Sequence, residues 1–258
     1  MASSVADFYD GLSPEYRDNM GWDWDTAVRK EGRQLDQFIC RQTGRQEPVS
    51  LLDCSCGIGT QAIGLALQGY RVHATDLSTV SIENASQEAG RLGVDITFGV
   101  ADFRQLADAV KNTFDVVLSC DNSIAHCLDD DFLNAALTSM GSRLNSGGLL
   151  LLSMRDYDAL IADKPRFNNQ HVQDKDDGCR VVFQLWEWAE DGGRYKMNQF
   201  LIREVDGEYD FKHFHTELRA LRREEILAAV SNAGFESARW HLPGDSGYYQ
   251  PIVTARKP

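Results

Sequence analysis

The stretch LLDCSCGIGT, residues 51–60, decides the fold class. It is an apolar run that ends in an acid, Asp53, and continues into a turn built from small residues. Residues 57–62 also satisfy the G-x-G-x-x-G/A pattern, in which glycines form a tight turn after a first strand and open a helix. In open α/β sheets, ligands bind at the carboxyl ends of the strands beside such turns. The stretch therefore predicts an α/β protein with a ligand site above this loop.

Strand-like and helix-like segments alternate on both sides of this stretch. Strands are expected at 49–54, 70–76, 95–102, 114–120 and 148–154, and helices at 60–68, 79–93 and 129–145. The run GLLLLSM at 148–154 is continuous and apolar, as in a parallel strand that is buried on both faces. Thr60 is expected to cap its helix, and Gly93 to end the next one. A further helix at 222–234 and two strands at 235–242 and 248–256, joined by a turn at 244–247, predict an antiparallel hairpin at the sheet edge.

These segments predict an α/β fold with a doubly wound, mostly parallel seven-stranded sheet that ends in the antiparallel C-terminal hairpin. Residues 1–46 are expected to form a helical N-terminal lid, and residues 47–258 the main domain. Strand-like runs at 180–188, 194–205 and 208–221 predict a small antiparallel β insertion at about 178–218. The acidic run DKDD at 174–177 is expected to be a solvated loop.

Composition limits the classes of partner. The net charge of the 258-residue chain is −13, which repels nucleic-acid backbones and anionic membranes. The N-terminus lacks the pattern of a signal peptide, and the longest apolar run is too short for a membrane span. None of the six cysteines forms a C-x-x-C pair, and Cys54, Cys56 and Cys120 are expected to be small buried residues. A cytoplasmic protein with a small-molecule partner is expected, either as a monomer or as a homo-oligomer.

Acidic residues follow three of the expected strands. Asp76 stands at the end of the second strand, where a carboxylate can accept both hydroxyls of a ribose. Asp102 and Phe103 offer an acceptor for an exocyclic amine and a ring for an adenine face. Asp53 selects between ligands, because a carboxylate near the glycine loop repels a pyrophosphate by roughly 4 kcal/mol per charge pair at an effective dielectric constant of 20. The same carboxylate attracts a sulfonium and an α-ammonium, so the pattern favours S-adenosylmethionine over NAD.

The same segments resemble the class I S-adenosylmethionine-dependent methyltransferases. The resemblance rests on LLDCSCGIGT, on ATD at 74–76, on ADF at 101–103 and on the closing hairpin, and it runs from about residue 48 to the end. The family's loop commonly has the form acid-x-G-x-G-x-G, and here Ser55 replaces the first glycine. The resemblance implies that the cofactor contacts Asp53, Cys54, Gly57, Gly59, Asp76, Leu77, Asp102, Phe103 and Cys120.

A narrower resemblance lies further along the chain. DNSIAHCL at 121–128 and MRDYDALI at 154–161 are similar to small-molecule N-methyltransferases related to glycine N-methyltransferase. That resemblance implies that Asn122 and Arg155 line the acceptor site, with Arg155 holding a substrate carboxylate. It also implies that the N-terminal segment folds over the cofactor. Arg29 and Arg33 are both candidates for the cofactor's carboxylate.

The N-terminal segment also carries four candidate lid aromatics, Tyr9, Tyr16, Trp22 and Trp24, of which Tyr16 and Trp24 are expected to close the pocket over a sulfonium. The expected activity is in-line methyl transfer from S-adenosylmethionine to the amine of an amino acid-like substrate, which needs no strong base. O-methylation of a natural-product hydroxyl, with His126 as the general base, is the first alternative. An NAD-dependent oxidoreductase and a non-catalytic nucleotide-binding module are the others.

Overall fold

The computed structural model describes residues 5–19, 23–44, 47 and 49–258. Its helices are α1 (Val5–Asn19), α2 (Trp24–Thr43), α3 (Thr60–Ala66), α4 (Thr79–Leu92), α5 (Leu106–Ala109), α6 (Asp130–Ser142), α7 (Tyr157–Asp163), α8 (Arg223–Asn232) and α9 (Pro243–Ser246), with 3₁₀ turns η1 (Phe103–Gln105) and η2 (Ser123–His126). The main sheet contains β1 (Ser50–Asp53), β2 (Arg71–Asp76), β3 (Thr97–Val100), β4 (Phe114–Ser119), β5 (Leu144–Ser153), β10 (Glu236–His241) and β11 (Ile252–Arg256). The second sheet contains β6 (Phe167–Lys175), β7 (Gly178–Trp188), β8 (Arg194–Val205) and β9 (Glu208–Arg219).

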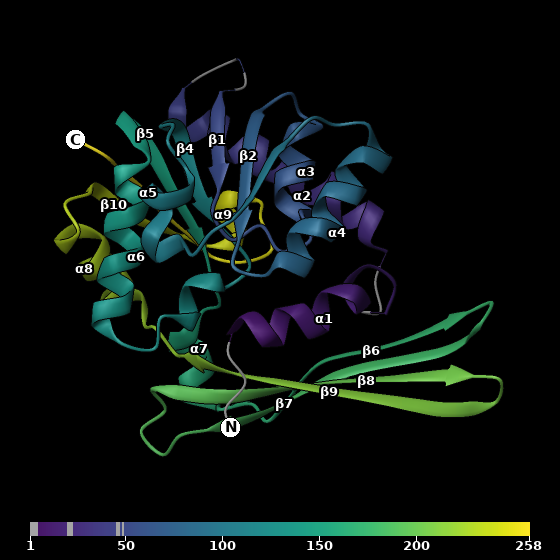
Figure 1. The fold of residues 1–258 in the computed structure, drawn as a ribbon. Coiled ribbons are helices and arrows are strands. Elements are labelled where there is room, and N and C mark those ends of the chain that lie inside the picture. The colour runs from purple at the N-terminus through teal and green to yellow at the C-terminus, as the bar shows by residue number, and fades with distance from the viewer. Residues whose placement is uncertain (1–4, 20–22, 45–46, 48) are drawn as a thin grey trace.

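The main sheet has the order β10-β11-β5-β4-β1-β2-β3, and helices cover both of its faces (Figure 1). Strands β1 to β5 are parallel, whereas β11 pairs antiparallel with both β5 and β10. This confirms the predicted doubly wound sheet with an antiparallel C-terminal hairpin. The strand order reverses between β1 and β4, which is the place where open α/β sheets bind ligands.

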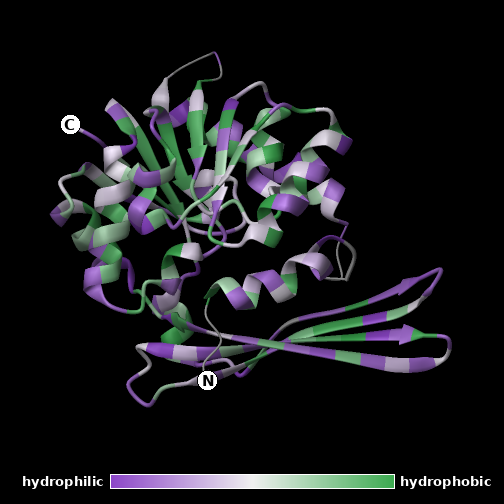
Figure 2. Ribbon diagram, in the orientation of Figure 1, coloured by the Kyte–Doolittle hydropathy of each residue, from purple (hydrophilic) through white to green (hydrophobic). Residues whose placement is uncertain are grey.

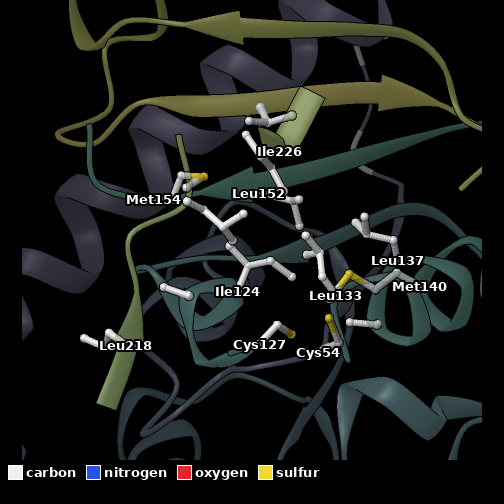
Figure 3. Packing of buried hydrophobic residues seen from close by; sticks show 14 of the residues in the cluster. Cys54, Ile124, Cys127, Leu133, Leu137, Met140, Leu152, Met154, Leu218 and Ile226 are labelled. Carbon is white, nitrogen blue, oxygen red and sulfur yellow. The ribbon is translucent and has the colours of Figure 1, made fainter. Parts of the chain in front are cut away.

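Buried aliphatic side chains hold this sheet between its helices. The central strands are apolar on both faces (Figure 2), and Leu149 to Leu152 of β5 are all at most 1% exposed. On one face, side chains from α6, η2, β5 and α8 form a continuous cluster that includes Cys54 and Cys127 (Figure 3). The predicted burial of Cys54, Cys56 and Cys120 is confirmed, and all six cysteines are free thiols.

The second sheet is larger than the sequence suggests. Three of its strands match the predicted insertion, but a fourth, β6, begins at Phe167, before the expected start at residue 178. The segment FNNQHVQDK is too polar to show strand periodicity, and it is an edge strand that pairs only with β7. The DKDD run is consequently divided, since Asp174 and Lys175 end β6 while Asp176 and Asp177 form the turn.

Helix α1 lies between the main domain and the second sheet (Figure 1). Its apolar residues Phe8 and Leu12 are buried in the same cluster as β5 and β9. On the α4 side, the hydroxyls of Ser13 and Ser81 lie 2.5 Å apart, and on the sheet side Lys212 forms a 2.5 Å ion pair with Glu15. The helix is thereby fixed over the carboxyl edge of the main sheet.

Two predicted helix boundaries differ in detail. Gly59, with φ 91°, occupies the N-cap position of α3, and Thr60 is its first helical residue rather than its cap. The expected turn at 244–247 contains the short helix α9, which ends at Gly247. Gly93 ends α4 in the left-handed conformation, as predicted.

Candidate active site

Two cavities meet beneath α1. The first, of about 340 Å³, lies over the glycine loop and the ends of β1 to β4, and is called the loop cavity here. The second, of about 370 Å³, lies between α2, the ends of β4 and β5 and the inner face of the second sheet, and is called the sheet cavity. Six junction residues line both cavities: Tyr9, Tyr16, Thr60, Gln61, Asp121 and His126. A group that moves from one cavity to the other passes these side chains.

The glycine loop and the second strand form the floor of the loop cavity. Gly57, with φ 52°, donates its backbone N–H to Oδ2 of Asp76 over 2.8 Å, and the backbone N–H of Ser78 donates to Oδ1 over 2.9 Å. These two bonds fix the Asp76 carboxylate at the cavity wall. Six of the predicted cofactor residues line the cavity: Cys54, Gly57, Asp76, Leu77, Asp102 and Phe103.

Asp53 lies behind this wall rather than in it. Its side chain is completely buried and lines neither cavity, and Cys54 and Ser55 stand in front of it. Oδ1 accepts a hydrogen bond from the backbone N–H of Ser55, whereas Oδ2 has no partner among the described residues. Burial, with a smaller contribution from Asp76, raises the pKa of Asp53 to about 8. Gly59 and Cys120 also line neither cavity.

Asp102 is held by its neighbour. The Arg104 guanidinium donates to its carboxylate, with Nη2 2.5 Å from Oδ2. Burial favours the protonated form of Asp102, but the hydrogen bonds from Arg104 outweigh it and hold the pKa of the carboxyl below its ordinary value. A ligand amine at this carboxylate would therefore share it with Arg104.

Arg155 lies in the wall of the sheet cavity among aromatic side chains. Its Nη1 donates to the hydroxyl of Tyr195 over 2.8 Å, and its guanidinium lies 4.9 Å from the centre of the Trp186 ring. Among the described residues, no carboxylate forms an ion pair with it. Arg155 thus presents a cation to the cavity without a protein counter-charge in contact.

Asn122 supports Arg155 from below. Its side chain is buried, and Oδ1 accepts hydrogen bonds from the backbone N–H of Arg155 over 3.1 Å and from the Tyr157 hydroxyl over 3.0 Å. Asn122 lines the sheet cavity and has a left-handed backbone with φ 69°. These contacts fix the start of the segment that carries Arg155.

His126 is a junction residue whose environment keeps it neutral. Its Nε2 lies 3.1 Å from the hydroxyl of Tyr9. Burial, and then the positive charge of Arg155, lowers the pKa of His126 to about 4. At neutral pH the imidazole is uncharged.

Asp121 is a junction residue that the sequence-based site did not include. Its Oδ1 accepts hydrogen bonds from the Tyr249 hydroxyl over 2.7 Å and from Nε2 of Gln250 over 3.2 Å, and its Oδ2 accepts one from the Tyr16 hydroxyl over 3.3 Å. The available signal was its place at the end of the fourth strand, directly before Asn122.

The cations of α2 are arranged differently from the expectation. Arg29 and Arg33 are exposed and line neither cavity, whereas Lys30 lines the sheet cavity. Beside it, Oε2 of Glu31 accepts hydrogen bonds from Nε2 of Gln61 over 2.8 Å and from the Tyr248 hydroxyl over 3.0 Å. Burial, and then the charge of Asp121, raises the pKa of Glu31 to about 7.

Trp24 is a structural side chain rather than part of a lid. It is 2% exposed, packs with Val28, Ile58 and Ile63, and donates its indole N–H to the Thr60 hydroxyl over 2.9 Å. It lines neither cavity, so it braces the glycine loop from behind. Trp22 lies outside the described residues.

Residues 51–148 match the family described as "Methyltransferase domain". The chain is 22% identical to a glycine/sarcosine N-methyltransferase from Halorhodospira halochloris, over 80% of this chain and 82% of that protein. The chain belongs to the class I S-adenosylmethionine-dependent methyltransferases. Its methyl donor is S-adenosylmethionine, as predicted.

Solved structures share the fold of this methyltransferase. The CcbJ methyltransferase from Streptomyces caelestis superposes with a TM-score of 0.75, at 17% identity, over 97% of this chain and 98% of that one. An S-adenosylmethionine-bound amino pentose methyltransferase from Micromonospora echinaspora gives a TM-score of 0.68, at 19% identity, over 92% and 93% of the two chains. These likenesses extend over the second sheet as well as the main domain.

None of the helices in the described ranges combines the length and the apolar composition that crossing a bilayer requires.

Proposed function

We propose that this methyltransferase methylates the amine nitrogen of a small, amino acid-like acceptor. Arg155 carries the proposal, because it offers a guanidinium to the sheet cavity with no ion-pair partner among the described residues. A carboxylate is the group that a guanidinium binds best, through charge-assisted hydrogen bonds. The aromatic contacts with Trp186 and Tyr195 hold the guanidinium in place for such a ligand.

The residues of the loop cavity fit the donor. S-adenosylmethionine supplies a methyl group activated on a positively charged sulfur. We infer that Asp76 would accept the ribose hydroxyls and that Phe103 and Asp102 would meet the adenine. The amino acid end of the cofactor would reach past the junction, where Lys30 of the sheet cavity would meet its carboxylate. Asp53 does not supply the negative charge that the sequence suggested, because it is buried behind the loop and burial raises its pKa to about 8, which favours the neutral carboxyl at neutral pH.

The remaining residues position the acceptor and exclude water. Asn122 fixes the segment that carries Arg155, so the acceptor's carboxylate would be held in one place. Tyr9 and Tyr16 of α1 cover the junction between the cavities, which keeps solvent from the reacting atoms. A neutral amine attacks with its lone pair, and no side chain has to remove a proton during the transfer.

The two segments outside the main α/β layers then have separate roles. Residues 1–46 act as a lid through α1 and complete the sheet cavity through α2. The β insertion builds the acceptor wall through Val182, Gln184, Met197, Gln199 and Leu218, all of which line the sheet cavity. The amides of Gln184 and Gln199 are hydrogen-bonded to each other over 2.8 Å, so they form a polar strip beside Val182, Met197 and Leu218.

The names of the similar proteins also support an amine acceptor. Glycine/sarcosine N-methyltransferases are described as acting on an amino acid and on its N-methyl derivative, and the pentose enzyme is described as acting on an amino sugar. O-methylation with His126 as the base has less support, because a pKa of about 4 makes the imidazole a weak base.

Methyl transfer to a matched series of acceptors tests the proposal. The series holds small amino acids, their amides, which lack the carboxylate, and the corresponding hydroxy acids, which lack the amine. We expect N-methylation of at least one amino acid and a much higher KM for its amide. Transfer to hydroxy acids or phenols would contradict amine methylation, and transfer only to amines without a carboxylate would contradict the amino acid-like class.

A further inference from the structure

One of the six residues at the junction between the cavities is an acid, Asp121. Of the six junction residues, Tyr9, Tyr16, Thr60 and Gln61 are uncharged, and His126 is neutral. Asp121 is thus the acid that faces both the donor side and the acceptor side of the described site. The reacting atoms would meet at this junction, since the nucleoside of the donor and the acceptor are assigned to different cavities.

Asp121 adopts a backbone conformation that few residue types favour. Its backbone is left-handed, with φ 54°, and the following Asn122 is left-handed as well. Two successive residues of this kind are uncommon outside glycine, although aspartate and asparagine tolerate the conformation best. The backbone N–H of Asp121 donates to the Ser153 hydroxyl over 2.8 Å, which anchors the bend to β5.

The carboxylate of Asp121 is also fixed from two further elements. Tyr16 reaches it from α1, and Tyr249 and Gln250 reach it from the loop before β11. All three are neutral donors, so they orient the carboxylate without neutralising its charge. No ion pair of Asp121 occurs among the described side chains. Arg155 lies within electrostatic range, since the charge of Asp121 contributes to its raised pKa, but the two side chains form no ion pair. The carboxylate is therefore available to a cationic ligand at the junction.

We propose that Asp121 is the counter-charge for the positive charge that moves from donor to acceptor during methyl transfer. The proposal rests on the proposed function for its acceptor half. In the transfer, the acceptor's lone pair forms the new nitrogen–carbon bond, and the pair of the breaking carbon–sulfur bond stays on sulfur. The charge thereby leaves sulfur, which becomes a neutral thioether, and appears on nitrogen as an ammonium. The proton that an ammonium acceptor loses beforehand goes to solvent.

This arrangement predicts a difference in ligand affinity that can be measured without methyl transfer. Asp121 should favour a donor-site ligand with a cation at the sulfur position over one without it. S-adenosylmethionine and S-adenosylhomocysteine provide that pair, since they share the nucleoside and the amino acid head and differ in the methyl and its charge. The ratio of their dissociation constants therefore isolates the counter-charge from other contacts.

Calorimetric titration of the full chain with both ligands tests the proposal. In Asp121→Asn the carboxylate charge is lost while size and tolerance of the left-handed backbone are kept. We expect affinity for S-adenosylmethionine to fall about tenfold and affinity for S-adenosylhomocysteine to stay within twofold. Asp121→Glu should restore part of the preference. Asp131→Asn removes an exposed acid that lines neither cavity, and the ratio should stay as in the wild type.

An unchanged ratio in Asp121→Asn would overturn the proposal. This holds if both affinities fall equally, as a purely structural role predicts, and also if neither affinity changes. If the variant does not fold, ligand binding to the wild-type protein still tests the proposal. An analogue with an ammonium in place of the sulfonium should then bind more tightly than S-adenosylhomocysteine, and equal or weaker binding would contradict the counter-charge. A hydroxyl acceptor in the methylation series would refute the proposed function while leaving this ratio interpretable.

Discussion

The backbones of Gly32 in α2 and Gly64 in α3 are in direct contact. A β-carbon on Gly32 would lie 2.3 Å from the carbonyl oxygen of Gly64, and one on Gly64 would lie 2.5 Å from the carbonyl oxygen of Val28. This close approach sets α2 against the helix that follows the glycine loop. Because α2 carries Lys30 and Glu31, the crossing also sets where both side chains meet the sheet cavity.

Replacing Gly32 with alanine should therefore separate the two helices. The clash is with backbone rather than with a flexible side chain, so we expect a loss of unfolding free energy of about 1–3 kcal/mol and weaker donor binding. Gly90 in α4 is a matched control, since a β-carbon there meets no atom within 4 Å. Gly90→Ala should be neutral or stabilising by about 0.5–1 kcal/mol, as is usual for glycine within a helix. Denaturant titration compares the two, and equal effects would contradict a tight crossing.

Lys30 and Arg33 provide a second matched pair, three residues apart on α2. Lys30 lines the sheet cavity and Arg33 lines neither cavity. Lys30→Ala should raise the dissociation constant for S-adenosylmethionine about fivefold, which corresponds to about 1 kcal/mol for a solvent-accessible charge. Arg33→Ala should leave it unchanged. A larger effect at Arg33 would return the cofactor's carboxylate to one of the two arginines that the sequence left as candidates.

Glu31 should make the stability of the ligand-free protein depend on pH. Its pKa is about 7 in the folded protein against an ordinary value of 4.5, so between these values the folded state binds more protons than the unfolded chain. The free energy of unfolding is therefore highest below pH 4.5 and falls as the pH rises through 7. Glu31→Gln removes this loss. We expect similar melting temperatures for variant and wild type at pH 5, and a variant more stable by about 2 kcal/mol at pH 8. A wild type that is the more stable at pH 8 would refute the assignment.

The sequence predicted the main sheet well because its strands alternate with helices and are apolar on both faces. The hairpin at residues 235–256 could be placed because a turn at 244–247 separates its two strand-like runs. Strand β6 could not, because nine residues with asparagine, glutamine, histidine and charges show no strand periodicity. Its pairing with β7 determines its conformation.

The candidate site was predictable where a residue follows a strand. Asp76, Asp102 and Arg155 line cavities because the carboxyl ends of parallel strands meet at one edge. The roles of Lys30 and Trp24 depend on which residues of α2 face the cavities. The helix precedes the glycine loop in the chain, and its sequence alone does not determine how it packs against that loop. Trp24 consequently packs behind the loop, and Lys30 rather than Arg33 reaches the cavity.

The central claim is that Arg155 holds the carboxylate of an amine acceptor, and the kinetics of Arg155→Ala test it most directly. The measurement compares KM for a methylated amino acid with KM for its amide, in wild type and variant, alongside the dissociation constant for S-adenosylmethionine. We predict that KM for the amino acid rises at least about thirtyfold, from the loss of about 2 kcal/mol of charge-assisted binding, while the other two constants change little. Equal changes in KM for the amino acid and its amide, or an equal loss of donor binding, would contradict the account.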